Sequence, residues 1–361
     1  MKLPILVTGG AGYIGAHCCN ALADAGFVAI TYDNLSTGHT DFVKWGPPVV
    51  GDVRDCASVN RAISDHKAAA VVHLAAASLV GESVVDPEKY YSHNVEGSLS
   101  VLRAMREAGC NHMVFSSTGA VYGNAGSEAL SERLPCFPVN PYGRSKLILE
   151  QALADYKAAY GLTSFTLRYF NASGARPEAG IGEQRQNETD LIPRAMSALS
   201  GQLGEFAIFG TDYATPDGTA IRDYIHVMDL ATAHVSAVQA LLEGQSGACC
   251  NLGTGRGYSV KQVLDAIADV AGRNVPHVVL DRRAGDPPVL VADPSAARRI
   301  IHFRAAASDL RTIVSSAWAW HVSRHGQGTL VEAPIMNSAA SAGLRTRLCS
   351  PECERVGSGS G

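Results

Sequence analysis

Short apolar runs alternate with helical patterns along the first half of this 361-residue chain. An apolar run at residues 3–7 leads into a stretch with apolar residues at helical spacing, which extends to about Ala25. A second run lies at residues 28–34. The run at residues 68–78, AAAVVHLAAAS, is continuously apolar, as in strands that a parallel sheet buries on both faces. This alternation predicts an α/β fold, with a doubly wound parallel sheet over roughly residues 1–170.

The alternation continues further along the chain. A helical pattern covers residues 87–109, and a strand at residues 112–123 carries three consecutive hydroxyl side chains, Ser116, Ser117 and Thr118. Ligands bind beyond the carboxyl ends of strands in such sheets, although Ser and Thr can equally form local turn bonds. Residues 224–255 predict another helix–strand unit. We therefore expect a smaller α/β substrate-binding domain at residues 171–325, with segments that return to the first domain.

The first strand runs into a glycine-rich turn, TGGAGYIG. Gly9, Gly12 and Gly15 recur every three residues, and Gly10 completes a GxGxxG pattern. Glycine permits a tight turn and a close backbone approach, and the start of the following helix offers free N–H groups to a pyrophosphate. Because a strand precedes the motif and a helix follows it, the sequence predicts a dinucleotide-binding site of the Rossmann type.

Acidic residues follow the second and third strands. Asp33 and Asn34 end the second strand, where a carboxylate accepts hydrogen bonds from the adenosine ribose and repels a 2′-phosphate. No Arg or Lys lies between Asp33 and Thr40, which favours NAD over NADP. Asp52 follows the third strand, and could either face the adenine amine or cap the next helix.

A tyrosine and a lysine lie four residues apart in PYGRSK. Pro141 suits the first position of a helix, so Tyr142 and Lys146 are expected on one helical face. A nearby ammonium lowers the pKa of a phenol by favouring the anion, and such a phenol can take a proton from a sugar hydroxyl. The pair alone is weak support, because the same spacing is common on exposed helices.

Composition narrows the class of protein. Hydrophobic residues make up 46% of the chain and charged residues 18%, and the net charge is −4, with no basic stripe for nucleic acid. The nine cysteines are scattered, with no zinc-site or disulfide spacing, so we expect reduced thiols, a cytoplasmic location and no metal. The apolar runs are too short for a signal peptide or a membrane span.

Together these motifs resemble the extended short-chain dehydrogenase/reductase family. The glycine-rich turn, the strand ending in SST and the Tyr-x-x-x-Lys pair occur in the family's order. The resemblance continues through RYFNASGA (168–175), residues 206–231 and RRAGDPP (282–288), and covers roughly residues 3–322. It is closest to members that epimerise carbon 4 of UDP-hexoses, and it implies a homodimer joined through the helices at about 87–109 and 141–160.

The resemblance implies catalytic and cofactor roles. Tyr142 would be the base at the sugar 4-hydroxyl, Lys146 would bind the nicotinamide ribose and lower the Tyr142 pKa, and Thr118 would hydrogen-bond near the reacting oxygen. The predicted NAD-binding residues are Gly9, Gly12, Tyr13, Ile14, Gly15, Asp33, Asn34, Asp52, Val53, Ala75, Asn94, Ser116, Tyr142, Lys146 and Tyr169.

Substrate roles follow from the same resemblance. Arg222 and Arg283 would bind diphosphate and ribose oxygens, and Asp286 would hold the uridine ribose, which suits guanidinium chemistry. Arg222 could equally pair with adjacent carboxylates, whereas His226 and His234 are expected to be packing or surface residues. The predicted substrate residues are Thr118, Asn171, Leu191, Arg222, Arg283, Asp286 and Leu290.

Four positions depart from the usual epimerase pattern. Ser78 stands where some relatives carry Lys, and Thr118 replaces the more usual Ser. Asp190 stands where Asn or His is frequent, and its charge puts that substrate contact in doubt. Leu290 falls where a Tyr in some relatives excludes N-acetyl groups. Because Leu is smaller, N-acetylated sugars stay open as substrates.

The predicted function is reversible, NAD-dependent 4-epimerisation of a UDP-hexose through a 4-keto sugar. The alternatives are a UDP-N-acetylhexosamine or UDP-pentose 4-epimerase and a non-catalytic NAD-sensing protein. A 4,6-dehydratase is disfavoured, because dehydratases carry Asp-Glu directly after the strand-end Thr, where this chain has Gly119 and Ala120. Residues 326–361 are expected to be an unstructured tail ending in a cloning scar, GSGSG.

Overall fold

The computed structural model describes residues 2–124, 129–283 and 286–326. These residues belong to one compact unit. The division expected near residue 170 therefore stays a prediction about two lobes of that unit. The expectation of an unstructured tail falls on residues 327–361, which lie outside the described residues, as do Cys349 and Cys353.

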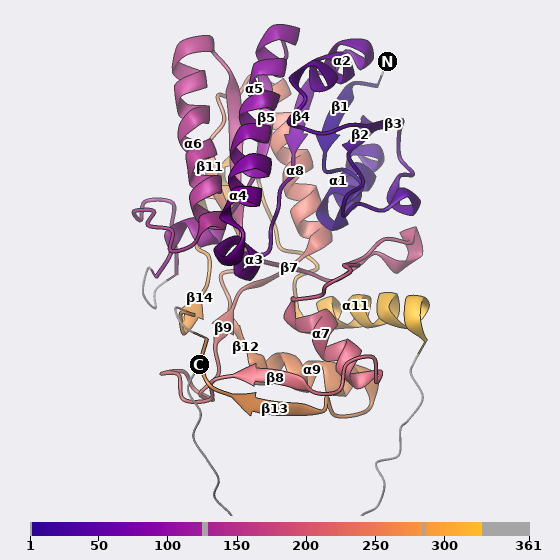
Figure 1. Cartoon of the computed structure of the whole chain (residues 1–361), viewed down its shortest axis with the longest axis vertical. Coiled ribbons are helices and arrows are strands. Elements are labelled where there is room, and N and C mark those ends of the chain that lie inside the picture. Colours follow the sequence, from indigo (N-terminus) through magenta and orange to yellow (C-terminus); the bar gives the residue numbers. More distant parts are fainter. Residues whose placement is uncertain (1, 125–128, 284–285, 327–361) are drawn as a thin grey trace, which may run out of the picture. The chain divides into compact units, whose positions relative to one another are not determined.

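A seven-stranded parallel sheet forms the upper lobe (Figure 1). Its strand order is β11-β6-β5-β4-β1-β2-β3. Successive strands are therefore added on one side of β1 up to β3 and on the other side from β4 onward, so the topological switch point lies between β1 and β4. The strands are β1 (Pro4–Thr8), β2 (Val28–Asp33), β3 (Pro48–Val50), β4 (Ala70–His73), β5 (His112–Thr118), β6 (Thr163–Tyr169) and β11 (Cys249–Leu252). The strands expected from the apolar runs are all present.

Helices cover both faces of this sheet because the apolar strands bury both. Ile5 and Val7 of β1 pack in the layer that contains α1 (Tyr13–Asp24) and α8 (Val227–Leu242). Leu6 of the same strand packs on the opposite layer. That layer holds α2 (Cys56–His66), α5 (Gly97–Ala108) and α6 (Pro141–Tyr160). Such alternation along one strand follows from its two-residue period, and the predicted doubly wound architecture is confirmed.

The helix–strand unit at residues 224–255 returns to this sheet as expected. Helix α8 packs against α1, and β11 pairs in parallel with β6, with Cys249 opposite Thr166. The sequence had indicated this helix–strand unit from residues 224–255.

The helix expected at residues 87–109 contains a widened turn. It comprises α4 (Pro87–Tyr90), a π-helical turn at Tyr91–Glu96 and α5, and it ends at Gly109 with φ +71°. A π turn inserts one residue into the helix and re-aims the side chains around it, and such turns often occur at functional sites.

The lower lobe is built from short elements around its own core (Figure 1). Its helices are α7 (Leu191–Leu199), α9 (Val260–Ala271) and α11 (Leu310–His325), and β8 (Phe206–Phe209) pairs with β13 (His277–Leu280). A second small sheet orders β12 (Tyr258–Ser259), β9 (Ile221–Arg222) and β14 (Val289–Leu290), and β7 (Asn171–Ser173) pairs with β10 (Tyr224–His226).

The remaining elements are α3 (Val80–Val85), α10 (Ser295–Ile300) and three 3₁₀ turns, Thr40–Phe42, Gly119–Tyr122 and Pro177–Ala179. Among the described residues, no helix combines the length and the apolar character that crossing a membrane requires. The seven cysteines in the same part of the chain are free thiols.

Candidate active site

The glycine-rich turn joins β1 to α1 at the carboxyl edge of the sheet. Gly9 has φ +72°, and a Cβ there would lie 2.7 Å from the backbone nitrogen of Ala75, just beyond β4. At Gly15 a Cβ would overlap the carbonyl oxygen of Gly9. The turn is therefore packed too closely for side chains and leaves its backbone accessible, which fits the cradle that a dinucleotide pyrophosphate needs. Tyr13 and Ile14 open α1 directly after it.

Asp33 braces this turn from the end of β2. Its carboxylate accepts hydrogen bonds from the Ala11 N–H at 3.0 Å and the Leu35 N–H at 2.8 Å. The predicted ribose-binding acid therefore lies beside the glycine-rich turn, where the adenosine end of a dinucleotide would be expected.

The alternative of a capping role for Asp52 is wrong. Asp55 caps α2, because its carboxylate accepts from the Ser58 N–H at 3.0 Å. Asp52 instead pairs with Arg54 at 2.8 Å and accepts from the Asn34 side chain at 3.1 Å. Hydrogen bonds from Arg54 hold the pKa of Asp52 well below its usual range. The predicted role of Asp52 at the adenine stays a prediction.

Asn94 in the π turn ties two parts of the site together. Its amide exchanges hydrogen bonds with the backbone of Ala77, at 2.8 and 3.0 Å, and donates to the Ser145 hydroxyl at 3.0 Å. The loop after β4, which contains Ala75, is thereby fixed to helix α6. Ser78 in the same loop is exposed.

Helix α6 presents Tyr142 and Lys146 from its first turns. Asn140 caps the helix by accepting from the Gly143 N–H at 2.8 Å, and Pro141 occupies the first position. Both predicted catalytic side chains are buried. The Lys146 ammonium donates to the Ser116 carbonyl at 2.9 Å and lies 5.0 Å from the centre of the Phe115 ring.

The predicted lowering of the Tyr142 pKa is not found in the chain by itself. Burial raises the pKa of Tyr142, and a hydrogen bond with the Thr118 hydroxyl and the charge of Arg185 only partly oppose that rise. Burial also lowers the pKa of Lys146 to about 7, so its charge is only partly present at neutral pH. Helical spacing gives the position of the Lys146 charge, but not the burial of either group.

The hydroxyls at the end of β5 have separate roles. Ser116 contacts the His234 ring at 3.1 Å and lies within hydrogen-bonding reach of Tyr169, whose pKa burial raises. Ser117 donates to Glu150 at 2.5 Å. Thr118 accepts from the Ala120 N–H at 3.1 Å, so the local turn bond and the contact with Tyr142 coexist.

An ion pair that the motifs did not indicate lies beneath these hydroxyls. Arg168 of β6 binds both carboxylate oxygens of Glu150 on α6, at 3.0 and 2.5 Å, and both side chains are about nine-tenths buried. Arg168 also donates to the Tyr122 hydroxyl at 2.9 Å. This bidentate pair fixes α6, and hence Tyr142, against the sheet.

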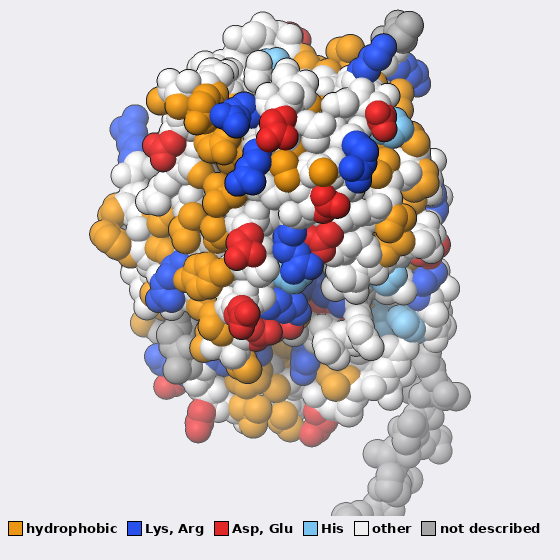
Figure 2. Space-filling view, turned by 45° about the horizontal axis from the view of Figure 1, so that its top comes forward, with side chains coloured by type: hydrophobic (Ala, Val, Ile, Leu, Met, Phe, Trp, Pro, Cys, Tyr) orange, Lys and Arg blue, Asp and Glu red, His pale blue; other side chains and the backbone are white. Residues whose placement is uncertain are grey.

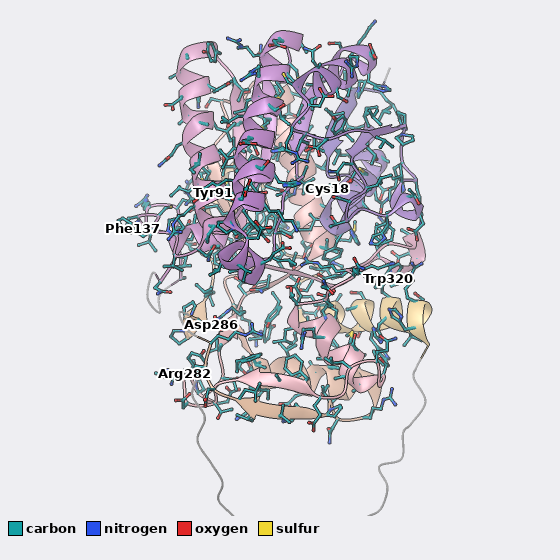
Figure 3. All side chains as sticks on the ribbon, viewed as in Figure 1. Cys18, Tyr91, Phe137, Arg282, Asp286 and Trp320 are labelled. Carbon is teal, nitrogen blue, oxygen red and sulfur yellow. The ribbon has the colours of Figure 1, made fainter. Side chains whose placement is uncertain are left out.

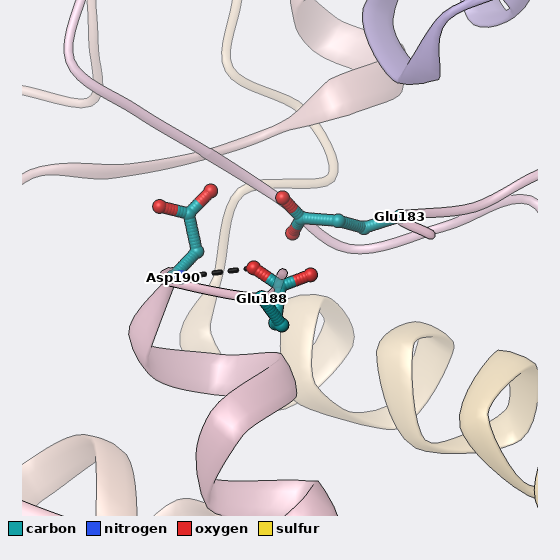
Figure 4. Close-up of side chains that lie close together, drawn as sticks. All are labelled: Glu183, Glu188 and Asp190. Carbon is teal, nitrogen blue, oxygen red and sulfur yellow. Dashed lines mark hydrogen bonds between the residues drawn. The ribbon is translucent and has the colours of Figure 1, made fainter. Parts of the chain in front are cut away.

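A cluster of carboxylates that the motifs did not indicate lies just before α7 (Figure 4). Carboxylates of Glu183, Glu188 and Asp190 gather before α7, and Glu188 accepts from the Asp190 N–H at 2.9 Å. Arg185 pairs with Glu183 at 3.2 Å and with Asp190 at 3.1 Å. Burial raises the pKa of Glu183. The signal in the sequence was the charged run GEQRQNETD immediately before the apolar LIP.

The predicted substrate residues come together from separate segments. Arg222 of β9 forms an ion pair with Asp286, which Figure 3 labels in the lower lobe near Arg282. Leu290 of β14 lies opposite Arg222 in the small sheet. Asn171 begins β7, and Leu191 begins α7. The Arg283 guanidinium lies 3.9 Å from the centre of the Phe209 ring.

Arg222 pairs with a carboxylate, as the alternative to phosphate binding allowed, but not with its neighbour in the sequence. Its neighbour Asp223 is fully buried and accepts hydrogen bonds from the Thr254, Gly255 and Ala292 N–H groups. These bonds occupy Asp223, so Arg222 turns to Asp286. The structural roles expected of two histidines are confirmed: His226 caps α8, and His234 is buried.

Comparisons with known proteins agree with this geometry. Residues 5–253 match the NAD dependent epimerase/dehydratase family. The chain is 50% identical over 317 residues to a UDP-glucose 4-epimerase of Rhizobium leguminosarum bv. trifolii, which covers 88% of this chain and 97% of the relative. Two solved structures are similarly close. The NAD complex of a UDP-glucose 4-epimerase from Brucella ovis has a TM-score of 0.87 at 48% identity, and covers 90% of this chain and 99% of that one.

The second solved structure carries a different sugar. It is a UDP-glucose-4-epimerase from Stenotrophomonas maltophila with bound NAD and formylated UDP-arabinopyranose. Its TM-score is 0.87 at 39% identity, and the match covers 90% of this chain and 99% of that one. From the glycine-rich turn, the Tyr142–Lys146 helix and these similarities, we conclude that the chain belongs to the NAD dependent epimerase/dehydratase family.

Proposed function

We propose that the protein interconverts UDP-glucose and UDP-galactose by NAD-dependent epimerisation at carbon 4. The observation that carries the proposal is the neighbourhood of Tyr142. Its phenol lies within reach of the Thr118 hydroxyl, on a helix whose Lys146 is fixed to the strand that ends in Thr118. The close-packed turn at Gly9 and Gly15 suits a dinucleotide, and the Arg222–Asp286 pair suits a nucleotide diphosphate.

In this proposal NAD, when bound, supplies the oxidation and re-reduction of carbon 4 through a 4-keto sugar. Tyr142 takes the proton of the 4-hydroxyl and later returns it, and Thr118 orients that hydroxyl by hydrogen bonding. Lys146 lies close enough to the strand end to bind the nicotinamide ribose. Arg222 and Arg283 hold the diphosphate, so the sugar can turn over while its tether stays in place.

Incubation of the purified protein with UDP-galactose tests the proposal. UDP-glucose should form without added NAD or any net change of NADH absorbance, because the cofactor is regenerated in each cycle. UDP-xylose and UDP-N-acetylglucosamine serve as parallel substrates. Turnover of only one of these would move the activity to a pentose or an N-acetylhexosamine, and turnover of none would favour the NAD-sensing protein.

The N-acetylhexosamine alternative rests on Leu290. This side chain packs partly buried beside Val121, Tyr122 and Leu130, and it lies opposite Arg222 in the small sheet. Leu290→Tyr should lower activity on N-acetylated substrates, because the larger ring would take the space of the acetyl group. Activity on UDP-galactose should change far less. Equal losses on both substrates would remove Leu290 from the pocket.

We also propose a homodimer and a cytoplasmic location. Tyr91, Leu99 and Ile148 are exposed apolar side chains on the π turn, α5 and α6. In Figure 2 hydrophobic side chains gather in the left half of the view, the side on which Figure 1 draws α5 and α6. Light scattering after size exclusion should give twice the chain mass, and a monomer mass would contradict the dimer. The free thiols suit a reducing compartment.

A further inference from the structure

A cavity outside the predicted NAD and substrate residues is lined by three arginines. It has a volume of about 600 Å³ and lies between the loop after β11 and the segment that joins α10 to α11. Arg256, Arg298, Arg304 and His302 line it, together with Thr254 and Tyr258. None of its lining residues is among those predicted to bind NAD or the substrate.

The three arginines that line this cavity form no ion pair with a carboxylate among the described residues. Arg304 forms no hydrogen bond or ion pair with any other described residue, and it is exposed. Arg298 donates to the Thr254 carbonyl at 3.2 Å, with Asp293 nearby, and the Arg256 guanidinium lies 5.2 Å from the centre of the Tyr258 ring. By contrast, Arg54, Arg168, Arg176 and Arg185 each pair with a carboxylate.

One carboxylate, that of Asp309, also lines the cavity and offsets one of its positive charges. Asp309 caps α11 by accepting from the Thr312 N–H at 2.9 Å. Several guanidinium groups around one concave space repel one another and focus a positive potential, which a multiply charged anion would relieve. Guanidinium groups match phosphate oxygens in geometry and charge.

The loop that carries Thr254 and Arg256 is held in place. The Thr254 and Gly255 N–H groups donate to the buried Asp223 carboxylate at 2.9 and 3.1 Å, and the Thr254 hydroxyl accepts from the Arg256 N–H at 3.0 Å. Tyr258 is fixed by strand pairing with Arg222. The backbone that carries Arg256 is therefore fixed before any ligand arrives, which lowers the entropy cost of binding.

We propose that this cavity binds a ligand carrying a di- or triphosphate group, at a site separate from the one that holds the UDP-sugar. Arg256, Arg298 and Arg304 bind its phosphate oxygens. The volume lies within the range typical of nucleotide-sized ligand sites.

Inorganic pyrophosphate is the probe that tests the proposal. The NAD-loaded protein, saturated with UDP so that the substrate site is filled, is titrated by calorimetry in a metal-free buffer of fixed ionic strength. One saturable site per chain is expected. No saturable binding under these conditions would overturn the proposal.

Charge-neutral variants locate the site. Arg304→Gln should weaken pyrophosphate binding about tenfold, the loss of one charge-assisted contact, and the double variant Arg298→Gln/Arg304→Gln should abolish it. The matched control is Arg61→Gln on α2, which removes one exposed positive charge elsewhere. Equal weakening in the control, or unchanged binding in the double variant, would show non-specific attraction and overturn the proposal. Circular dichroism and NAD content establish that each variant is folded.

A parallel titration with ADP separates two sources of the same chemistry. Equal affinity for ADP and pyrophosphate would show that the phosphates alone are recognised, whereas tighter binding of ADP would add contacts to a nucleoside. Both results require the loss of binding in the Arg298→Gln/Arg304→Gln protein. ADP binding that survives in that protein would place it elsewhere and count against the cavity.

Discussion

The two ends of the candidate site are held together by different interactions. At the glycine-rich turn, contacts are between backbones: the Gly9 N–H donates to the Tyr32 carbonyl at 2.8 Å, and neighbouring chain segments leave no room for a Cβ. In the lower lobe, short strands and loops are joined by charged side chains, such as Arg222 with Asp286 and Arg185 with Asp190. Added side-chain volume should therefore disturb the glycine-rich turn most, whereas removal of a charged side chain should disturb the lower lobe most.

Tyr142 lies near the Thr118 hydroxyl and the Arg185–Asp190 pair, and its substitution should have the largest effect. Tyr142→Phe keeps the ring and removes only the hydroxyl, so turnover of UDP-galactose should fall by about 10²- to 10⁴-fold, the usual contribution of a general acid–base group. NAD should remain bound, because the glycine-rich turn is unchanged. Steady-state assays and the NAD content of the purified protein check both expectations. Unchanged turnover would remove Tyr142 from the mechanism.

A matched pair of alanine substitutions tests the sensitivity to volume. Gly15→Ala places a Cβ onto the Gly9 carbonyl oxygen, whereas a Cβ at Gly12 would lie 3.3 Å from the same atom. Overpacking of this kind costs about 1–3 kcal/mol, so Gly15→Ala should lower the free energy of unfolding by that amount. Gly12→Ala should lower it much less. Urea unfolding of the two variants gives the comparison, and similar losses in both would contradict it.

The Arg168–Glu150 pair is an exception to this division, because it is a buried ion pair within the upper lobe. Arg168→Met leaves the Glu150 carboxylate buried without its partner, which typically costs about 3–5 kcal/mol. The double variant Arg168→Met/Glu150→Leu should recover most of that loss, because no charge stays unpaired. Urea unfolding of the single and double variants measures the difference. A double variant as unstable as the single one would show that the ion pair itself stabilises the upper lobe.

Charge removal near Tyr142 should give the smallest effects, with opposite signs. Arg185 lowers the Tyr142 pKa and Asp190 raises it. The phenol must lose its proton to act as a base, so Arg185→Gln should move the acidic limb of the activity–pH profile to higher pH. Asp190→Asn should move it to lower pH. Changes of a few-fold in turnover near neutral pH are expected, and shifts in the same direction would contradict the electrostatic account.

The difference between the two ends also explains what the sequence could predict. The glycine-rich turn, Asp33 and the Tyr142–Lys146 pair each occupy a few consecutive residues of one strand–turn–helix unit. Local spacing was therefore enough to place them. Local spacing did not give the Tyr142 pKa, and it left two roles open for Asp52. Burial depends on what packs over a residue, and the folded chain uses Asp55 as the cap of α2.

The order of strands and helices, the glycine-rich turn and the helix that carries Tyr142 and Lys146 could all be predicted from the sequence. These features follow from periodicity and from glycine and proline geometry, which act over short stretches of chain. Three contacts could be learned only from the folded chain. Arg222 pairs with Asp286, Arg168 is paired within the upper lobe, and Arg185 lies near Tyr142. These contacts join distant segments, and the partner of a charge is set by which carboxylate the folded backbone brings within reach.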